Sequence, residues 1–297
     1  MADDAGPSGW VTLKDALTTF ARAEHGTQGQ RQIRPLHWHV ACRLVVEGGF
    51  HPDEVVPRPP FTVRTKGGVA LLDYDPSSQR SGERTILGGL KTKTVDVVVT
   101  KPDIGPCVAV SIKGTLNAFR NLTNRMEEAA GDCTNLHLAY PALVYAFWHV
   151  MRANREGAVL AGSEKILGPP GSAVKAADIA IDSAGDPSSF IRRYEFAMEG
   201  LTGRAGLRDE SSRYEAIGLT LASVEPPTLG EIHSSFPAAD SPLSMTKMFE
   251  TIYRQYDLRF VYQAPDLSSR TRRLEWSRDS PALNVAGTAD FEPRLAG

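Results

Sequence analysis

Residues 95–113 read VDVVVTKPDIGPCVAVSIK, and this stretch indicates the fold class. It holds two runs of β-branched residues with a short loop of Pro and Gly between them. β-branched side chains favour extended backbone, and Pro and Gly favour turns, so the pattern predicts a β-hairpin. If the hairpin turns about Asp103 and Ile104, Asp96 lies directly opposite Ser111.

Three polar side chains are expected on one face of this hairpin. Side chains alternate along a strand, so Lys113 points to the same face as Ser111, and Asp96 faces both from the other strand. Polar groups among Val and Ile need partners or a function. A carboxylate that holds Mg²⁺ and an ammonium that orients or activates a water are the groups that phosphodiester hydrolysis uses.

Helical patterns surround the hairpin. Thr12 with Asp15 three residues later resembles a capping box, and Pro35 opens a second helix that ends with Glu47 before two glycines. The order of elements predicts an α/β protein with a central mixed β-sheet flanked by helices. Further predicted elements are a strand at 69–74, a helix after Gly114 with an apolar stripe from Leu116 to Ala129, a helix near 188–200, a strand near 214–224, a helix near 242–256 and a strand at 258–262. The apolar run 142–151 fits a strand or a helix, and residues 156–188 read as loops.

The composition is that of an ordinary globular protein. The chain has 297 residues, 41% hydrophobic and 23% charged, with a net charge of −2, which excludes a disordered chain and a generally basic nucleic-acid coat. Its three cysteines form no CxxC pair, so a cysteine zinc site is not expected. Residues 1–10 carry no secretion signal, and the most apolar stretch, 138–148, is too short to span a membrane. We therefore expect one soluble cytoplasmic domain.

A second acid is needed beside Asp96, because one carboxylate rarely holds a metal alone. Residues Asn117, Arg120, Asn124 and Glu127 follow a helical spacing and form a polar stripe that could supply it. Glu127 is the expected acid, provided that this helix turns back along the strand of Lys113. Its neighbour Glu128 is the rival and faces about 100° away on the helix.

The combination of Asp96, Ser111-Ile112-Lys113 and Glu127 resembles the PD-(D/E)xK nuclease superfamily. More narrowly, it resembles the type II restriction endonucleases that cut CCGG and related sites. In that group Ser replaces the acid of the strand motif, and a Glu about 14 residues past the Lys substitutes for it. The resemblance implies a restriction-endonuclease-like core over about half of the chain, residues 35–150.

The resemblance also implies roles for individual residues. Asp96 and Glu127 would be metal ligands, with the main-chain carbonyl of Ile112 completing the shell, and Lys113 would be the catalytic lysine. Ser111 occupies the motif position but is not expected to be a nucleophile, because no His is placed as its base. Two further groups are Glu47, which matches loosely the place of an additional acid, and Asn117, Arg120, Asn124 and Arg125, which would face DNA.

The activity implied is Mg²⁺-dependent cleavage of double-stranded DNA, with Mn²⁺ as a substitute, by a prokaryotic restriction endonuclease with access to the nucleoid. Cutting both strands of a symmetric site favours a homodimer or homotetramer. The alternatives are a phage-defence or repair nuclease without strict site specificity, and a non-catalytic DNA-binding module with the same fold. We expect one nuclease domain with N-terminal helices (1–60), a catalytic core with a loop-rich insertion (61–225) and a C-terminal β/α extension (226–297).

Two other motifs are not expected to act. Residues 88–92, Gly-Gly-Leu-Lys-Thr, lack the spacing of a phosphate-binding loop, so no nucleotide cofactor is expected. His37 and His39 lie two positions apart in a helical stretch, where they do not share a face, so a metal site made by this pair is not expected either.

Overall fold

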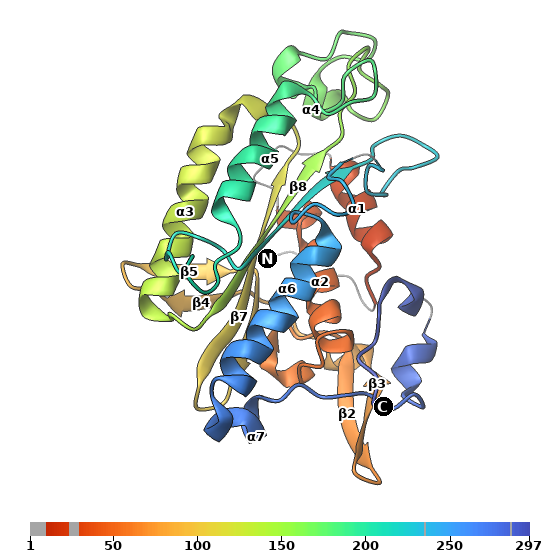
Figure 1. Ribbon diagram of the computed structural model, residues 1–297. Helices are drawn as coiled ribbons and strands as arrows, with labels where there is room; N and C mark the ends of the chain where they lie inside the picture. Colours follow the sequence, from red (N-terminus) through yellow and green to blue (C-terminus); the bar gives the residue numbers. More distant parts are fainter. Residues whose placement is uncertain (1–9, 24–29, 235, 286) are drawn as a thin grey trace.

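A five-stranded mixed sheet forms the centre of the fold, in the strand order β1-β6-β7-β8-β9 (Figure 1). The computed structural model describes residues 10–23, 30–234, 236–285 and 287–297; the expectation for the first nine residues lies outside this part. The α/β class with a mixed, helix-flanked sheet is confirmed. The strands of this sheet are β1 (Val55–Val56), β6 (Val97–Lys101), β7 (Gly105–Thr115), β8 (Val144–Arg152) and β9 (Ala216–Ala222).

The predicted hairpin is formed by β6 and β7, and its register is the expected one. Val97 pairs with Val110 and Val99 pairs with Val108, before the register shifts next to the turn. Asp96 directly precedes β6, so it stands at the position opposite Ser111. The expected hairpin and its register are therefore confirmed.

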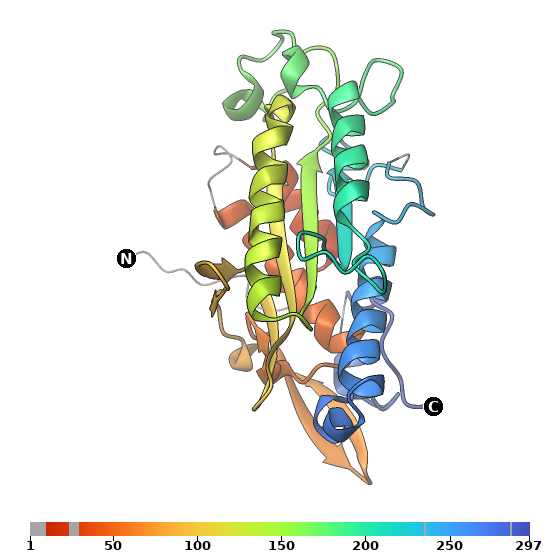
Figure 2. The same cartoon turned by 60° about the vertical axis from the view of Figure 1, so that its left-hand side comes forward.

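β7, β8 and β9 run parallel to one another, so each connection must cross over a face of the sheet. The ambiguous run 142–151 is a strand, because β8 lies between two neighbours and is buried along its whole length. The two crossovers contain the helices α3 (Leu122–Ala139) and α5 (Ser189–Leu201), which lie side by side over one face (Figure 2). The opposite face is covered by α1 (Leu13–Ala21), α2 (Arg34–Val46) and α6 (Met245–Tyr256).

Two small hairpins and several short helices complete the fold. The hairpins are β2 (Phe61–Lys66) with β3 (Val69–Tyr74), and β4 (Arg84–Leu87) with β5 (Thr92–Val95). Short α-helices are α4 (Glu164–Leu167) and α7 (Ser268–Thr271). Single 3₁₀ turns lie at Gln30–Gln32, Pro52–Glu54, Pro76–Ser78, Phe119–Asn121, Ala176–Asp178, Pro265–Leu267, Pro281–Asn284 and Thr288–Asp290. No membrane-crossing helix occurs among the residues that the structure describes.

One predicted helix begins later than expected, and one predicted strand is wrong. The helix after Gly114 does not begin at Leu116, because β7 continues to Thr115 and Ala118 takes a left-handed conformation (φ 53°) that interrupts the chain before α3. The predicted strand at 258–262 is a π-helix that continues α6. There the apolar residues pack against the helix before them: the ring of Phe260 lies 5.2 Å from that of Tyr256.

A buried ion cluster joins three segments at the start of β9. The carboxylate of Glu215 is 1% exposed and accepts hydrogen bonds from Arg204 (3.0 Å), Arg259 (2.7 Å) and the backbone amide of Tyr145 (2.7 Å). Burial opposes ionisation of Glu215, but its hydrogen bond and charge contact with His137 and the pairing with Arg259 outweigh it, so the pKa of this carboxyl is lowered. Its charge therefore stabilises the folded state.

We expect Glu215→Gln to destabilise the protein by about 3 kcal/mol at pH 7, since it removes the counter-charge of Arg259 and one of the two carboxylates that pair with Arg204. The folded pKa lies below the unfolded one, so this stabilisation is complete above the unfolded pKa and is lost as the pH falls through the folded pKa. Urea unfolding at pH 7 and pH 3 would measure both effects. The variant should lose less stability on acidification than the wild type.

The matched control is Glu250→Gln, which removes an exposed ion pair with Lys247 on α6 and should cost less than about 0.5 kcal/mol. If Glu215→Gln unfolds at the same urea concentration as Glu250→Gln, the cluster does not hold the three segments together.

Candidate active site

Asp96 is the single residue between the strands β5 and β6. β5 ends at Val95 and β6 begins at Val97, and the Asp96 side chain accepts a 2.6 Å hydrogen bond from the backbone N–H of Ile112. The carboxylate thus takes the place of a backbone acceptor next to the last hydrogen-bonded pair of β6 and β7. This bond fixes one carboxylate oxygen at the edge of β7 and leaves the other directed away from the sheet.

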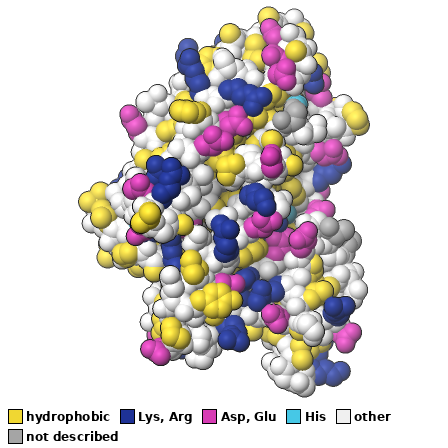
Figure 3. Space-filling view, in the orientation of Figure 1, with side chains coloured by type: hydrophobic (Ala, Val, Ile, Leu, Met, Phe, Trp, Pro, Cys, Tyr) yellow, Lys and Arg dark blue, Asp and Glu magenta, His cyan; other side chains and the backbone are white. Residues whose placement is uncertain are grey.

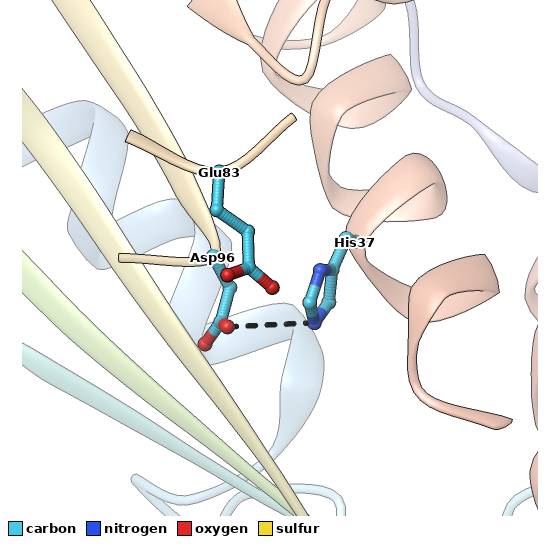
Figure 4. Close-up of side chains that lie close together, drawn as sticks. All are labelled: His37, Glu83 and Asp96. Carbon is cyan, nitrogen blue, oxygen red and sulfur yellow. Dashed lines mark ion pairs between the residues drawn. The ribbon is translucent and has the colours of Figure 1, made fainter. Parts of the chain in front are cut away.

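Two side chains from distant segments meet the second oxygen of Asp96 (Figure 4). His37, in the first turns of α2, places its Nε2 atom 3.6 Å from Asp96 Oδ1. Glu83 reaches the same point from the loop before β4, and one ligand atom from each of the three residues lies within 4.8 Å of the others. Two carboxylates and an imidazole are a donor set that divalent metal ions accept.

Burial sets the charges of this cluster. It lowers the pKa of His37 to about 4, so the imidazole is neutral at pH 7 and offers a ring-nitrogen lone pair. Its Nε2 atom has no hydrogen-bond partner among the described residues. Burial raises the pKa of Asp96, although the Ile112 amide and the Lys113 ammonium partly oppose this. Ionisation of Asp96 therefore costs more here than in water, and a bound cation would offset part of that cost.

Lys113 lies on the expected face of β7, and its positive charge favours the ionised form of Asp96. Its Nζ atom is 3.8 Å from a carboxylate oxygen of Glu128, and both side chains are partly exposed. A small cavity lies beside them, with Ser111 and His149 in its wall. Asp96 and Lys113 are thus brought together as the sequence predicted, and both remain candidate catalytic residues.

The helix α3 presents Glu128, and not Glu127, to Lys113. Glu127 is exposed and does not line the cavity, whereas Glu128 and Asp132, one turn further on, both do. Asp132 is buried and forms ion pairs with Lys93 and Lys91 of the β4–β5 hairpin. The expected spacing from Lys113 selected the wrong neighbour because the chain between β7 and α3 includes a 3₁₀ turn, which changes the phase of the helix.

The Ser111 side chain is hydrogen-bonded to a residue other than Asp96, and Ile112 contributes to the site through its backbone. The Ser111 hydroxyl shares a buried 2.7 Å hydrogen bond with the hydroxyl of Tyr145, so it is already satisfied. The Ile112 side chain points to the opposite face, into the core with α2 and α6. Its N–H binds Asp96, and because the N–H and C=O of one residue face the same strand edge, its carbonyl is directed to that edge too.

Glu47 does not join this cluster. It ends α2, ten residues after His37, which is about 15 Å along the helix axis. Its carboxylate pairs with Arg43 at 2.8 Å and accepts hydrogen bonds from Tyr253 and from the backbone of Glu292. These contacts give Glu47 a structural role at the C-terminal end of α2.

The four residues expected to face DNA occupy different environments. The Asn117 amide donates to the carbonyl of Ile166 and so ties two loops together. Arg120 and Asn124 are exposed near the N-terminal end of α3, and Arg125 is half-buried in the wall of the cavity beside Lys113. Arg120, Asn124 and Arg125 therefore remain available to a ligand that approaches Lys113.

His37 and Glu83 were not predicted as site residues. His37 was considered only as a pair with His39, whose ring instead contacts the backbone carbonyl of Val11. Glu83 lies in a loop without hydrophobic periodicity, so the neighbouring sequence does not indicate that it is a site residue. Both reach Asp96 only through tertiary packing of α2 and of the loop before β4.

Comparison with known proteins adds no assignment: no family model, no curated protein and no solved structure matches the chain. The function of the chain is therefore inferred from the geometry of this site.

We expect Mn²⁺ to raise the melting temperature of the wild type at pH 7.5, because a ligand that binds only the folded state stabilises it. At one hundred times its dissociation constant the gain is about 2.7 kcal/mol, which corresponds to a shift of roughly 4 °C for a chain of 297 residues. His37→Ala and Asp96→Asn should abolish most of this shift. Glu127→Gln, an exposed carboxylate outside the cluster, is the control and should keep it.

The melting temperatures of the same variants are also measured in EDTA, to show that the variants fold without metal. The pKa of Asp96 is raised in the folded state, so stability falls as the pH rises through the unfolded and then the folded pKa. Asp96→Asn keeps a hydrogen-bond acceptor for Ile112 without the charge, and at pH 7.5 it should melt no lower than the wild type. An equal Mn²⁺ shift in Asp96→Asn and the wild type would exclude the cluster as the metal site.

Proposed function

We propose that the chain is a divalent-metal-dependent nuclease that hydrolyses phosphodiester bonds of double-stranded DNA, as a restriction endonuclease does. The observation that carries the proposal is the position of Asp96. Its carboxylate is held by the strand that bears Lys113 and is joined by His37 and Glu83. A metal-binding group next to an ammonium, where β7 continues beyond the start of β6, suits attack by water on a phosphate.

The residues fit a divalent cation. The cluster combines two carboxylates, of which Glu83 is exposed and free to close on an ion, with an imidazole that is neutral at pH 7. Oxygen ligands suit Mg²⁺, and the imidazole shifts the preference towards Mn²⁺. A bound ion would neutralise phosphate charge and lower the pKa of a bound water.

The protein's own groups would then divide the remaining work. Asp96, fixed by the Ile112 amide, would orient the cluster relative to β7. Lys113, whose ammonium is partly exposed, would hold the attacking water or a non-bridging phosphate oxygen. Glu128, with a carboxylate oxygen 3.8 Å from the Lys113 ammonium, would accept a proton from that water.

Double-stranded DNA is proposed as the substrate because of the surface near α3. Lys and Arg are interspersed with Asp and Glu over the face seen in Figure 3, as the nearly balanced net charge requires. A DNA contact must therefore be local, and Arg120 and Asn124 are exposed at the end of α3 that follows β7. Because one chain carries one such centre, cleavage of both strands would call for an even number of subunits.

We expect the wild type to cut plasmid DNA with Mn²⁺ or Mg²⁺, and Asp96→Asn and Lys113→Met to lose at least about 100-fold in rate. Glu128→Gln should lose more activity than Glu127→Gln, because only Glu128 contacts Lys113. Gel analysis of a defined plasmid measures each rate.

The pattern of products separates the possible roles. Discrete bands indicate site-specific restriction, whereas a smear indicates a nuclease without strict specificity. DNA binding with no cleavage under either metal, or equal cleavage by Lys113→Met, would contradict the catalytic assignment and favour a binding module.

A further inference from the structure

Two adjoining cavities lie at the carboxyl ends of β8 and β9, at the upper end of the sheet in Figure 1. Their volumes are about 350 and 250 Å³, and Arg155, Val224 and Glu225 line both. In open sheets with parallel strands, ligands bind outside the carboxyl ends of the strands. Neither cavity includes a residue of the Asp96 cluster.

A buried arginine borders the smaller cavity. Arg152 ends β8 and is only 3% exposed. It donates to the carbonyl of Ala21 (2.9 Å), the amide oxygen of Asn154 (2.7 Å) and the hydroxyl of Ser163 (2.6 Å). All three acceptors are neutral, and within the described residues Arg152 forms no ion pair.

The charge of Arg152 therefore lacks a counter-charge in contact with it. Burial lowers the pKa of this guanidinium to about 10, and the more distant charge of Glu225 only partly offsets the effect. A guanidinium has five N–H donors, so two remain after the three bonds to neutral groups. Buried charges in proteins are normally paired, because the cost of removing an ion from water is several kcal/mol.

A second arginine stands at the junction of the two cavities. Arg155 is exposed, and its guanidinium forms no hydrogen bond or ion pair in the described part of the chain. Two hydroxyl groups lie close by, those of Ser223 and Thr228 in the wall of the larger cavity. The amide of Asn154, in the wall of the smaller cavity, already donates to the carbonyls of Leu116 and Asp178 and only holds Arg152 in place. Two guanidinium groups with hydroxyl donors are the groups that bind a tetrahedral oxyanion.

We propose that these cavities bind a phosphate-type oxyanion, held by Arg152 from within and by Arg155 from the rim. The anion supplies the counter-charge that Arg152 lacks. It also accepts hydrogen bonds from the N–H groups of Arg155, which have no other partner in the described part of the chain. Three carboxylates also line the cavities: Glu225 in the shared wall, Glu156 in the smaller cavity and Glu231 in the larger one, and their charges repel the anion and limit its affinity. The site stands on these contacts alone and does not require the proposed nuclease activity.

The phosphate group has two possible sources, a free phosphate ion or the backbone of bound DNA. Both present the same oxygen atoms to a guanidinium, but only a DNA phosphate brings a polymer to the upper end of the sheet. The experiment therefore uses inorganic phosphate and a short DNA duplex as separate probes, each with the metal-free full chain.

We expect inorganic phosphate, added against an equal ionic strength of chloride, to raise the melting temperature of the wild type. Arg155→Ala should weaken phosphate binding about tenfold without lowering stability in chloride, because Arg155 has no partner to lose. Glu225→Gln should strengthen binding. The matched control is Arg278→Ala, another exposed arginine, which lines neither cavity and should bind phosphate like the wild type.

The outcomes distinguish the two sources and the two proposals. Loss of phosphate binding in Arg155→Ala, with unchanged duplex affinity, identifies a site for the free anion. A duplex affinity that falls several-fold in Arg155→Ala but not in Arg278→Ala identifies a backbone contact. If Arg155→Ala changes neither binding constant, the proposal is overturned. Asp96→Asn should bind phosphate normally, so failure of the metal centre would leave this result unaffected.

Discussion

The hydrogen bond from the Ile112 amide to the Asp96 carboxylate is the contact on which the candidate site depends. In this bond a side-chain oxygen takes the place of a backbone acceptor of the sheet. The carboxylate of Asp96 is therefore fixed to β7 at Ile112. Without this bond, Asp96 would be one acid on a mobile bend between β5 and β6. With it, the carboxylate has a fixed position relative to Lys113 on the same strand as Ile112, and α2 brings His37 to its free oxygen.

Burial then decides what each polar group can do. The same desolvation keeps His37 neutral and makes the charge of Asp96 costly, so the pair favours a cation more than two exposed side chains would. Elsewhere a buried charge has partners of opposite charge: the carboxylate of Glu215 accepts hydrogen bonds from Arg204 and Arg259. Arg152 contrasts with Glu215 because its bonds go to neutral groups only. Buried charge without a full set of charged partners therefore occurs at two separate places, Asp96 and Arg152.

Local pattern was enough to predict the hairpin, its register and the positions of Asp96, Ser111 and Lys113, because strand pairing follows from alternation and from the turn. It was not enough to choose between Glu127 and Glu128, since the 3₁₀ turn before α3 leaves no periodic signal. His37 and Glu83 reach the site through contacts between distant segments, which one sequence does not display. The predicted strand at 258–262 failed for a related reason: its apolar residues find their partners on the preceding helix rather than on a neighbouring strand.

The proposed metal centre requires that an imidazole and the carboxylate of Asp96 hold one cation together. Pulsed electron paramagnetic resonance of the Mn²⁺-loaded protein measures this directly, because a nitrogen ligand produces a resolved coupling to the metal. We predict a nitrogen coupling in the wild type that disappears in His37→Ala, while Glu127→Gln retains it. A spectrum without nitrogen coupling, or one that is unchanged in His37→Ala, would contradict the claim.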